Sequence, residues 1–363
     1  MASLVTAYLK LIKRLFPLHP QSSSIGLELC PSACKAVELS FKNGAFELSR
    51  WSIEPLTAND DPSVLAALGK VLPAPGASAG PRAVVASVSG KGTLVRYVDM
   101  PRMSTQDLRR AFAIESDKYF PFPKDTVYTD CYILETTDSN RKMSVLVAAV
   151  KKDLVDGRLK VLKDAGVEPL TVSLSSVAVA NAFVAFPPAG FASGAGAREF
   201  KACAVVDIGE AGTNLMMVFA GLPRFNRDIF IGTQEIYKRL SNLLGIPLAE
   251  AGALLRPGAG VSEAASKGVD AVMTSLIAEI RLSFEYFVTE KNLAITQVFL
   301  AGDGAQIPGV EEAFRAALDI PVEIWDPFAR MNTAPGVEKA GLKAVSSRLI
   351  TALGLALNEY DQG

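Results

Sequence analysis

A meander of three strands that leads into helices and a further buried strand occurs twice in this chain, and this repeat constrains the fold most. In the first half, alternating apolar residues and short turns predict antiparallel strands over 25–29, 35–41 and 45–53. In the second half, the same signals predict strands over 202–208, 214–220 and 224–231. The buried strands that follow are predicted at 83–88 and 298–301. An internal duplication of this length predicts two similar α/β lobes.

A segment with its own character lies between the two copies. A helix that Ser104 caps is followed by strands over 128–134 and 145–149 and by a helix from 153 to 165. The order helix, two strands, helix predicts a small α/β insert within the first lobe.

Composition excludes several classes of protein. The 363 residues, 49% of them hydrophobic, are enough for two compact domains. The formal net charge of -1 gives no global basic field, so we expect no nucleic-acid partner. Four scattered cysteines argue against a disulfide scaffold and favour a cytoplasmic location. The single histidine, His19, leaves no basis for histidine catalysis or a histidine metal site.

The first 16 residues have the pattern of an amphipathic, basic helix. The residues that define its apolar and basic faces include Leu4, Tyr8, Leu11 and Leu15 on one side and Lys10, Lys13 and Arg14 on the other. No run of about 18 uncharged apolar residues occurs, so we expect no transmembrane helix. Three interpretations stay open for this helix: contact with an anionic membrane surface, docking on a partner protein, or covering an apolar patch of its own domain.

Two glycine-rich turns carry the candidate chemistry. In VVDIGEAGTNL, glycines allow backbone N–H groups to approach phosphate oxygens, and Thr213 adds a hydroxyl donor. Asp207, at the end of the preceding strand, suits a hydrated Mg²⁺ that is carried by those phosphates. The turn in LAGDGA lies between a strand and a helix, where a nucleotide can bind. We identify no catalytic residue, and we interpret Glu210 as a solvated turn residue.

The order of these motifs resembles the type IV pilus assembly protein PilM family, relatives of the cell-division protein FtsA in the actin-like ATPase superfamily. The matching blocks are IGLELCPSACKAVELS, STQDLRRAFAIESDKYFPFP, SVLVAAVKKDLVDGRLKVLKDAGVEPLTV, VVDIGEAGTNL, EIRLSFEYF and VFLAGDGAQIPGV. The similarity extends from about residue 25 to residue 357. The YFPFP and AGDGAQIPG blocks are the specific ones, because phosphate loops alone indicate only an actin-like protein.

The resemblance implies a duplicated actin-like (ribonuclease H-like) fold of two lobes, with a small α/β insert domain in the first lobe. The implied domains are a helix and linker over 1–24, a first lobe over 25–92 and 166–200, the insert over 93–165, a second lobe over 201–340, and a C-terminal helix over 341–363 that returns to the first lobe.

The resemblance also implies the site and the partners. The nucleotide-binding residues carried over by position are Ser32, Lys35, Asp207, Gly209, Gly212, Thr213, Glu279, Ser283, Gly302, Gly304 and Ala305. The family is a cytoplasmic scaffold peripheral to the inner membrane, which binds ATP with Mg²⁺ and a short peptide of the membrane protein PilN. Tyr119, Phe120 and Phe122 are the candidate peptide contacts, with core packing as the competing interpretation.

The sequence departs from the family pattern in the first phosphate loop. Pro31 has no N–H to donate, and Cys30 and Ala33 replace a glycine and a hydroxyl residue. Each lost hydrogen bond to a charged group costs about 1.5 to 3 kcal/mol, so we expect ATP and Mg²⁺ to bind weakly or not at all. Asp303 stands where the family tends to have glycine, and we expect it to be harmless if its side chain points to solvent.

An alternative function is a membrane-tethered, FtsA-like polymerising ATPase, which should form filaments that depend on ATP. A sugar or acetate kinase of the same superfamily would need an aspartate base in a substrate cleft and larger lobes. The short second half and the YFPFP insert argue against a kinase.

Overall fold

The computed structural model describes residues 23–42, 44–72, 82–137, 142–191, 202–256 and 262–357. The predicted amphipathic helix at the N-terminus lies outside these residues. Within them, no helix has the length and apolar character that crossing a bilayer requires.

The sheet of the first lobe is built from the first meander and the strands that follow it. Its strands are β1 (Ser23–Leu29), β2 (Ala33–Lys42), β3 (Ala45–Pro55), β4 (Arg82–Val88), β8 (Thr171–Leu174) and β14 (Asn332–Thr333). They lie in the order β14-β3-β2-β1-β4-β8, with β4 parallel to β1 and β8 parallel to β4. The last strand of the chain, β14, therefore completes a sheet that begins with the first.

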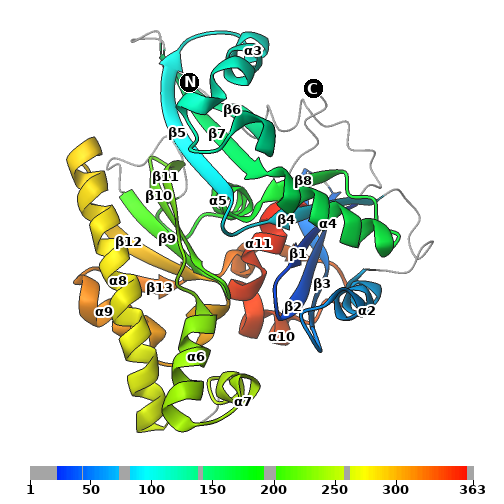
Figure 1. Ribbon diagram of the computed structural model, residues 1–363, viewed down its shortest axis with the longest axis vertical. Coiled ribbons are helices and arrows are strands. Elements are labelled where there is room, and N and C mark those ends of the chain that lie inside the picture. Colours follow the sequence, from blue (N-terminus) through cyan, green and yellow to red (C-terminus); the bar gives the residue numbers. More distant parts are fainter. Residues whose placement is uncertain are drawn as a thin grey trace.

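The second lobe repeats this topology. Its strands are β9 (Ala202–Ile208), β10 (Thr213–Phe219), β11 (Leu222–Ile229), β12 (Ile295–Ala301) and β13 (Val322–Ile324), in the order β11-β10-β9-β12-β13. Its helices are α6 (Thr233–Leu244), α7 (Leu248–Ala253), α8 (Glu263–Lys291) and α9 (Val310–Leu318). In both lobes the middle strand of the sheet, β1 or β9, pairs antiparallel with the meander and parallel with the next strand. The duplication expected from the sequence is present (Figure 1).

The insert lies at one end of the molecule, above the two lobes in Figure 1. It consists of β5 (Thr93–Pro101), α3 (Thr105–Glu115), β6 (Val127–Thr137) and β7 (Lys142–Lys151), with the sheet order β5-β7-β6. The helix that follows, α4 (Lys152–Asp164), was expected in the insert but packs on the first lobe, where its Leu162 shares a core with Ile25 and Leu27. The sequence prediction of two strands was wrong, because β5 had been overlooked. The predicted cap is present, since the Ser104 side chain accepts a hydrogen bond from the Asp107 N–H at 3.1 Å.

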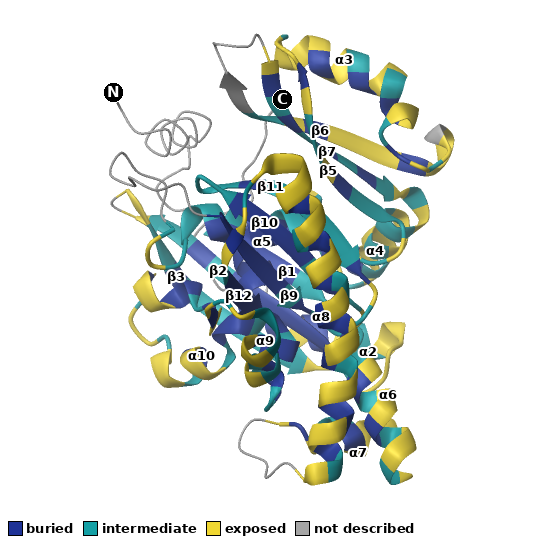
Figure 2. Cartoon of the chain, turned by 90° about the vertical axis from the view of Figure 1, so that its left-hand side faces the viewer, coloured by how far each residue is buried: buried dark blue, intermediate teal, exposed yellow. Residues whose placement is uncertain are grey.

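Four more α-helices pack on the first lobe, and all but the first of them share a core with the second lobe. They are α2 (Asp61–Val71), α5 (Ser175–Ala185), α10 (Lys339–Val345) and α11 (Ile350–Ala356). Helices α5 and α11 pack together and belong to a hydrophobic core that also contains Val37 and Leu39 of β2 and Val205 of β9. Figure 2 shows that the central strands of the two lobes are mostly buried, while the outer face of α8 is exposed. One continuous core therefore joins the two lobes.

Two glycines allow α11 to enter this core. A Cβ atom added at Gly354 would lie 1.7 Å from the carbonyl oxygen of Ala178 in α5. A Cβ atom added at Gly26 in β1 would lie 1.9 Å from the carbonyl oxygen of Ala352 in α11. Backbone therefore lies against backbone on both sides of α11, and neither contact leaves room for a side chain.

We predict that Gly354→Ala lowers the free energy of unfolding by about 3 kcal/mol or more, because α11 must move away from α5. Urea unfolding measures the effect. The matched control is Gly69→Ala in α2, where an added Cβ meets nothing within 4 Å and the change should stabilise the helix by up to about 1 kcal/mol. Equal stability of the two variants would show that α11 is not held against α5 in solution.

Candidate functional site

A small cavity lies between the lobes, where the first hairpin faces the second. Its volume is about 120 Å³. The predicted site residues that line it are Lys35, Asp207, Gly209, Gly212, Thr213 and Gly302. Ser32 lies beside it, bound to Glu210 of the lining. The structure therefore brings the first hairpin turn, the turn around Gly209 and Gly212, and the start of the turn at Gly302 to one cavity.

The turn between β1 and β2 has few backbone donors left for an anion. The N–H of Cys30 donates to the Ala33 carbonyl within the turn at 2.8 Å. Pro31 has no N–H. The N–H and the hydroxyl of Ser32 both donate to the Glu210 carboxylate Oε2, at 2.9 Å and 2.7 Å. A phosphate in this turn would have to displace Glu210.

Glu210 corrects an interpretation made from the sequence. It is not merely a solvated turn residue, because its half-buried carboxylate crosses the cleft to Ser32 of the first lobe, in a contact that is itself exposed to solvent. Its other oxygen, Oε1, accepts a hydrogen bond from the Gln234 side chain at 3.3 Å. Ser32 and Glu210 are 178 positions apart in the chain. For this reason the hydrogen bonds between them have no local sequence signal.

The ammonium of Lys35 is buried among carboxylates of both lobes. Its Nζ lies 2.5 Å from Asp303 Oδ2 and 3.5 Å from Glu28 Oε2, and its side chain is 3% exposed. Desolvation alone would lower the pKa of Lys35, but the carboxylates of Asp303 and Glu28 outweigh it and hold the pKa well above its usual value. Lys35 is therefore a permanent cation in the cleft.

The Asp303 side chain does not point to solvent, so the condition under which the sequence analysis expects it to be harmless is not met. Its carboxylate also accepts a hydrogen bond from Arg348 Nε at 2.6 Å. Desolvation alone would raise the pKa of Asp303, but the charges of Lys35 and Arg348 hold it below its usual value. Arg348 was not among the predicted site residues, because it lies in the C-terminal part of the chain, in no motif that the sequence marks.

The second phosphate loop is also occupied by its own hydrogen bonds. The N–H of Gly209 donates to the Gly212 carbonyl at 2.9 Å. The hydroxyl of Thr213, which was expected to donate to phosphate, donates to the Ile231 carbonyl at 2.7 Å. Asp207 faces the same cavity, and its burial, together with the nearby Glu28, raises its pKa to about 7.

Glu279 and Ser283 of α8 do not line this cavity. Arg227 of β11 lies against both of them, with NH2 2.7 Å from Glu279 Oε2 and NH1 2.8 Å from Ser283 Oγ. Gly304 and Ala305 are buried behind the loop, where a Cβ atom at Gly304 would lie 2.3 Å from Ile208 Cγ2. Glu279 and Ser283 are therefore bound to Arg227, and Gly304 and Ala305 are buried within the second lobe.

A Mg²⁺–ATP complex does not fit this arrangement. Pockets for ligands of this size have volumes of about 300 to 1,000 Å³, well above that of the cavity. Its walls carry the carboxyl groups of Glu28, Asp207 and Asp303, and the two cations among them, Lys35 and Arg348, are already paired with Asp303 and so are not free to bind a triphosphate. Within the described residues, no group of three or more His, Cys, Asp or Glu side chains is arranged to hold a metal ion.

The aromatic residues expected to bind a peptide pack mainly into the insert. Phe120 is buried beside Phe112, with the ring centroids 5.8 Å apart, while Tyr119 and Phe122 are half-buried against the same core. They do not form an exposed aromatic surface. The exposed aromatics of the insert are instead Tyr128 and Tyr132 of β6.

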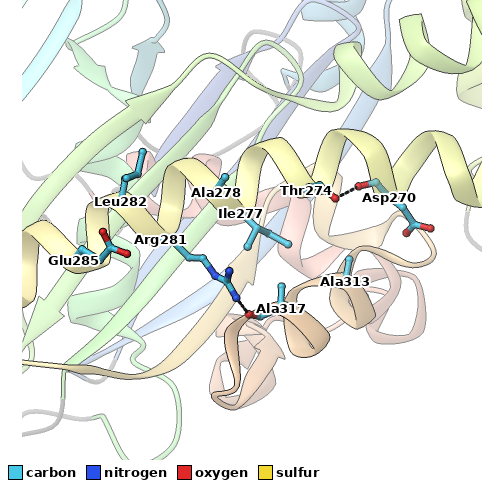
Figure 3. A pocket seen from close by; sticks show the side chains of 9 residues that line it. All are labelled: Asp270, Thr274, Ile277, Ala278, Arg281, Leu282, Glu285, Ala313 and Ala317. Atoms are coloured by element: carbon cyan, nitrogen blue, oxygen red, sulfur yellow. Dashed lines mark hydrogen bonds between the residues drawn. The ribbon is translucent and has the colours of Figure 1, made fainter.

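A larger hollow of about 580 Å³ lies on the second lobe, between α8 and α9. Figure 3 shows Ile277, Ala313 and Ala317 on its apolar floor, with Arg281 reaching across to the Ala317 carbonyl. The polar groups do not converge on one point, so this hollow lacks the chemistry of a small-molecule site.

Comparisons with known proteins agree with this architecture. A family model described as type IV pilus assembly protein PilM matches residues 26–360. The chain is similar to a solved structure of the PilM-PilN type IV pilus biogenesis complex, with a TM-score of 0.77 and 22% identity, over 92% of this chain and 97% of the other. It is also similar to the ethanolamine utilization protein EutJ from Carboxydothermus hydrogenoformans, with a TM-score of 0.52 and 14% identity, over 98% of each chain. The expected actin-like fold is confirmed.

The Asp207 carboxyl gives a pH-dependent prediction. Between about pH 4 and pH 7 the folded chain holds a proton here that the unfolded chain releases, so this residue lowers stability as the pH rises through that window. Asp207→Asn removes the free-energy cost of ionising this buried carboxyl. We therefore expect the variant to be more stable than the parent by on the order of 2 to 4 kcal/mol at pH 8 and by less at pH 5.

Thermal unfolding at pH 5, 6, 7 and 8 measures the difference between the variant and the parent. The control is Asp164→Asn, an exposed carboxylate that pairs with Lys160 on α4. A difference that does not grow with pH would show that Asp207 is ionised in the folded chain throughout.

Proposed function

The chain belongs to the type IV pilus assembly protein PilM family, and from this premise we propose that it is an actin-like scaffold at the cytoplasmic side of the inner membrane. It connects a PilN-like membrane protein to a pilus or related secretion machine, and it binds ATP weakly or not at all. The observation that carries this proposal is the likeness to the PilM-PilN complex over almost the whole length of both chains, insert included.

The geometry of the cleft supports a scaffold rather than a nucleotide-driven machine. The donors of the first phosphate loop are used within the protein, and Lys35 is neutralised by Asp303 and Glu28. The alternative, an FtsA-like polymerising ATPase, requires a nucleotide between the lobes. The charges and hydrogen bonds that fill this cleft argue against it.

The partner peptide is proposed to bind the first lobe and its insert. Tyr128 and Tyr132 lie two positions either side of Asp130 on β6, on one face of the strand. Both are more than 40% exposed, at 45% and 41%. Exposed tyrosines at an interface supply a large contact area with little loss of side-chain freedom. They replace Tyr119, Phe120 and Phe122 as the preferred peptide contacts.

The N-terminal helix is proposed as a peripheral membrane contact. The motivation is the sequence pattern alone, with Lys10, Lys13 and Arg14 on the polar face. One basic helix binds membranes modestly, so the PilN-like partner would supply the second contact.

We predict that the chain co-sediments with anionic liposomes and that deletion of residues 1–20 reduces the bound fraction severalfold, because the basic face is lost. The control is neutral liposomes, which should bind neither protein strongly. If the deletion changes nothing, the helix docks on protein instead.

The partner proposal is tested with the N-terminal cytoplasmic peptide of a PilN-like protein as the probe. We predict that Tyr128→Ala and Tyr132→Ala each weaken binding about tenfold, as expected for aromatic interface residues. Fluorescence anisotropy measures the affinity. The matched control is Ile114→Ala, which changes an apolar side chain of α3 that is 73% exposed. Unaltered affinity in both tyrosine variants would exclude this face of the insert as the peptide site.

A further inference from the structure

The two positions in the cleft that could hold an anionic ligand already hold carboxylates. We propose that this cleft binds two carboxylates of its own chain, Glu210 and Asp303, in place of the phosphates of a nucleotide, and that they lock the lobes together. The inference deepens the proposed function and rests on it for the statement that the family fold is used here without nucleotide.

The first position is the turn of the first hairpin. Ser32 offers a backbone N–H and a hydroxyl on the same side, and both bind one oxygen of Glu210. This is the arrangement by which a turn binds a phosphate oxygen, with a charged acceptor and two short hydrogen bonds. Ser32 belongs to the first lobe and Glu210 to the second, so the contact closes the cleft.

The second position lies deeper, at the ammonium of Lys35. Lys35 comes from β2 of the first lobe, and Asp303 from the loop after β12 of the second lobe. Arg348 binds the other oxygen of Asp303. Two cations therefore hold one carboxylate, as two cations hold a phosphate group. The Lys35 side chain is 3% exposed and that of Asp303 is 22% exposed, so solvent screens this pair less than it screens a surface ion pair.

The two carboxylates belong to the chain, so neither has to be captured from solution. In the first turn, Pro31 has no N–H and the Cys30 N–H is bound to the Ala33 carbonyl, so Glu210 takes the two donors of Ser32. Each carboxylate is therefore a tethered ligand of the cleft. Such a ligand binds without the entropy cost of capturing a free molecule.

The side chains of Glu210 and Asp303 therefore hold the lobes closed without a bound cofactor. Partner binding would then depend on a permanently closed scaffold, and nucleotide hydrolysis could not switch it. A ligand could enter only after Glu210 and Asp303 withdraw.

The test uses the full chain and three variants: Glu210→Ala, Asp303→Gly and both together. The control is Glu235→Ala, which removes an exposed carboxylate that pairs with Lys238 on α6. The probes are magnesium pyrophosphate and Mg²⁺–ATP, titrated calorimetrically up to about 1 mM. This range detects dissociation constants up to about 1 mM, which corresponds to a binding free energy of about −4 kcal/mol. Hydrogen exchange over 28–35 reports opening of the cleft.

We expect no binding heat for the parent or for Glu235→Ala. Glu210→Ala should raise exchange in the first hairpin about tenfold or more, because two charge-assisted hydrogen bonds are lost. The double variant should bind magnesium pyrophosphate at least tenfold more tightly than the parent. If Asp303→Gly does not fold, the inference is tested with Glu210→Ala alone, by hydrogen exchange and by the pyrophosphate titration.

Two results would overturn the inference. One is tight binding of Mg²⁺–ATP by the parent, since its own carboxylates would then not fill the cleft. The other is a folded Glu210→Ala variant with unchanged exchange and unchanged pyrophosphate binding. Neither measurement involves the PilN-like peptide, so loss of peptide binding would contradict the proposed function while leaving this inference standing.

Discussion

The ammonium of Lys35, enclosed between carboxylates of two lobes, is the interaction on which the site depends. A buried charge is tolerated only when its partners are close and well oriented, and removing one partner typically costs about 3 to 5 kcal/mol. Here the partners come from both halves of the duplication, Glu28 from the first and Asp303 from the second. The lobes cannot move far apart without separating Lys35 from Asp303, its nearer partner, which would leave only Glu28 at 3.5 Å. Electrostatics thus acts together with the apolar core to fix the relative position of the lobes.

The fold itself was largely predictable because its signals are local. Alternating apolar residues, Asn43-Gly44 and Gly221 in turns, and the Ser104 cap each act over a few residues, and the strands and helices they mark are present. The strand β5 was missed because it follows the turn around Gly90 and Gly92 without a hairpin partner nearby. It pairs with β7, about 50 residues later in the chain.

The site was predictable only in part, for the same reason. The sequence motifs correctly indicated that Asp207, Gly209 and Gly212 line one cavity together with Lys35. The pairs that fill the cleft join residues far apart in sequence, 178 positions for Ser32 with Glu210 and 268 for Lys35 with Asp303. Neither hydrophobic periodicity nor residue propensity predicts such pairs, because Glu210 and Asp303 each lie in a segment whose composition is typical of a surface turn. The residue types were visible in the sequence, whereas their partners required the fold.

The close packing of α11 has a consequence for how the chain is made. β1 is synthesised among the first strands, yet the helix that covers it at Gly26 is among the last elements to leave the ribosome. The same holds for β14, which pairs with β3. The second lobe has all its strands before that point and can fold as a unit during synthesis. The lobe that is translated first is therefore completed last, and until then its apolar sheet face must be kept from other chains by the ribosome's surroundings or by chaperones.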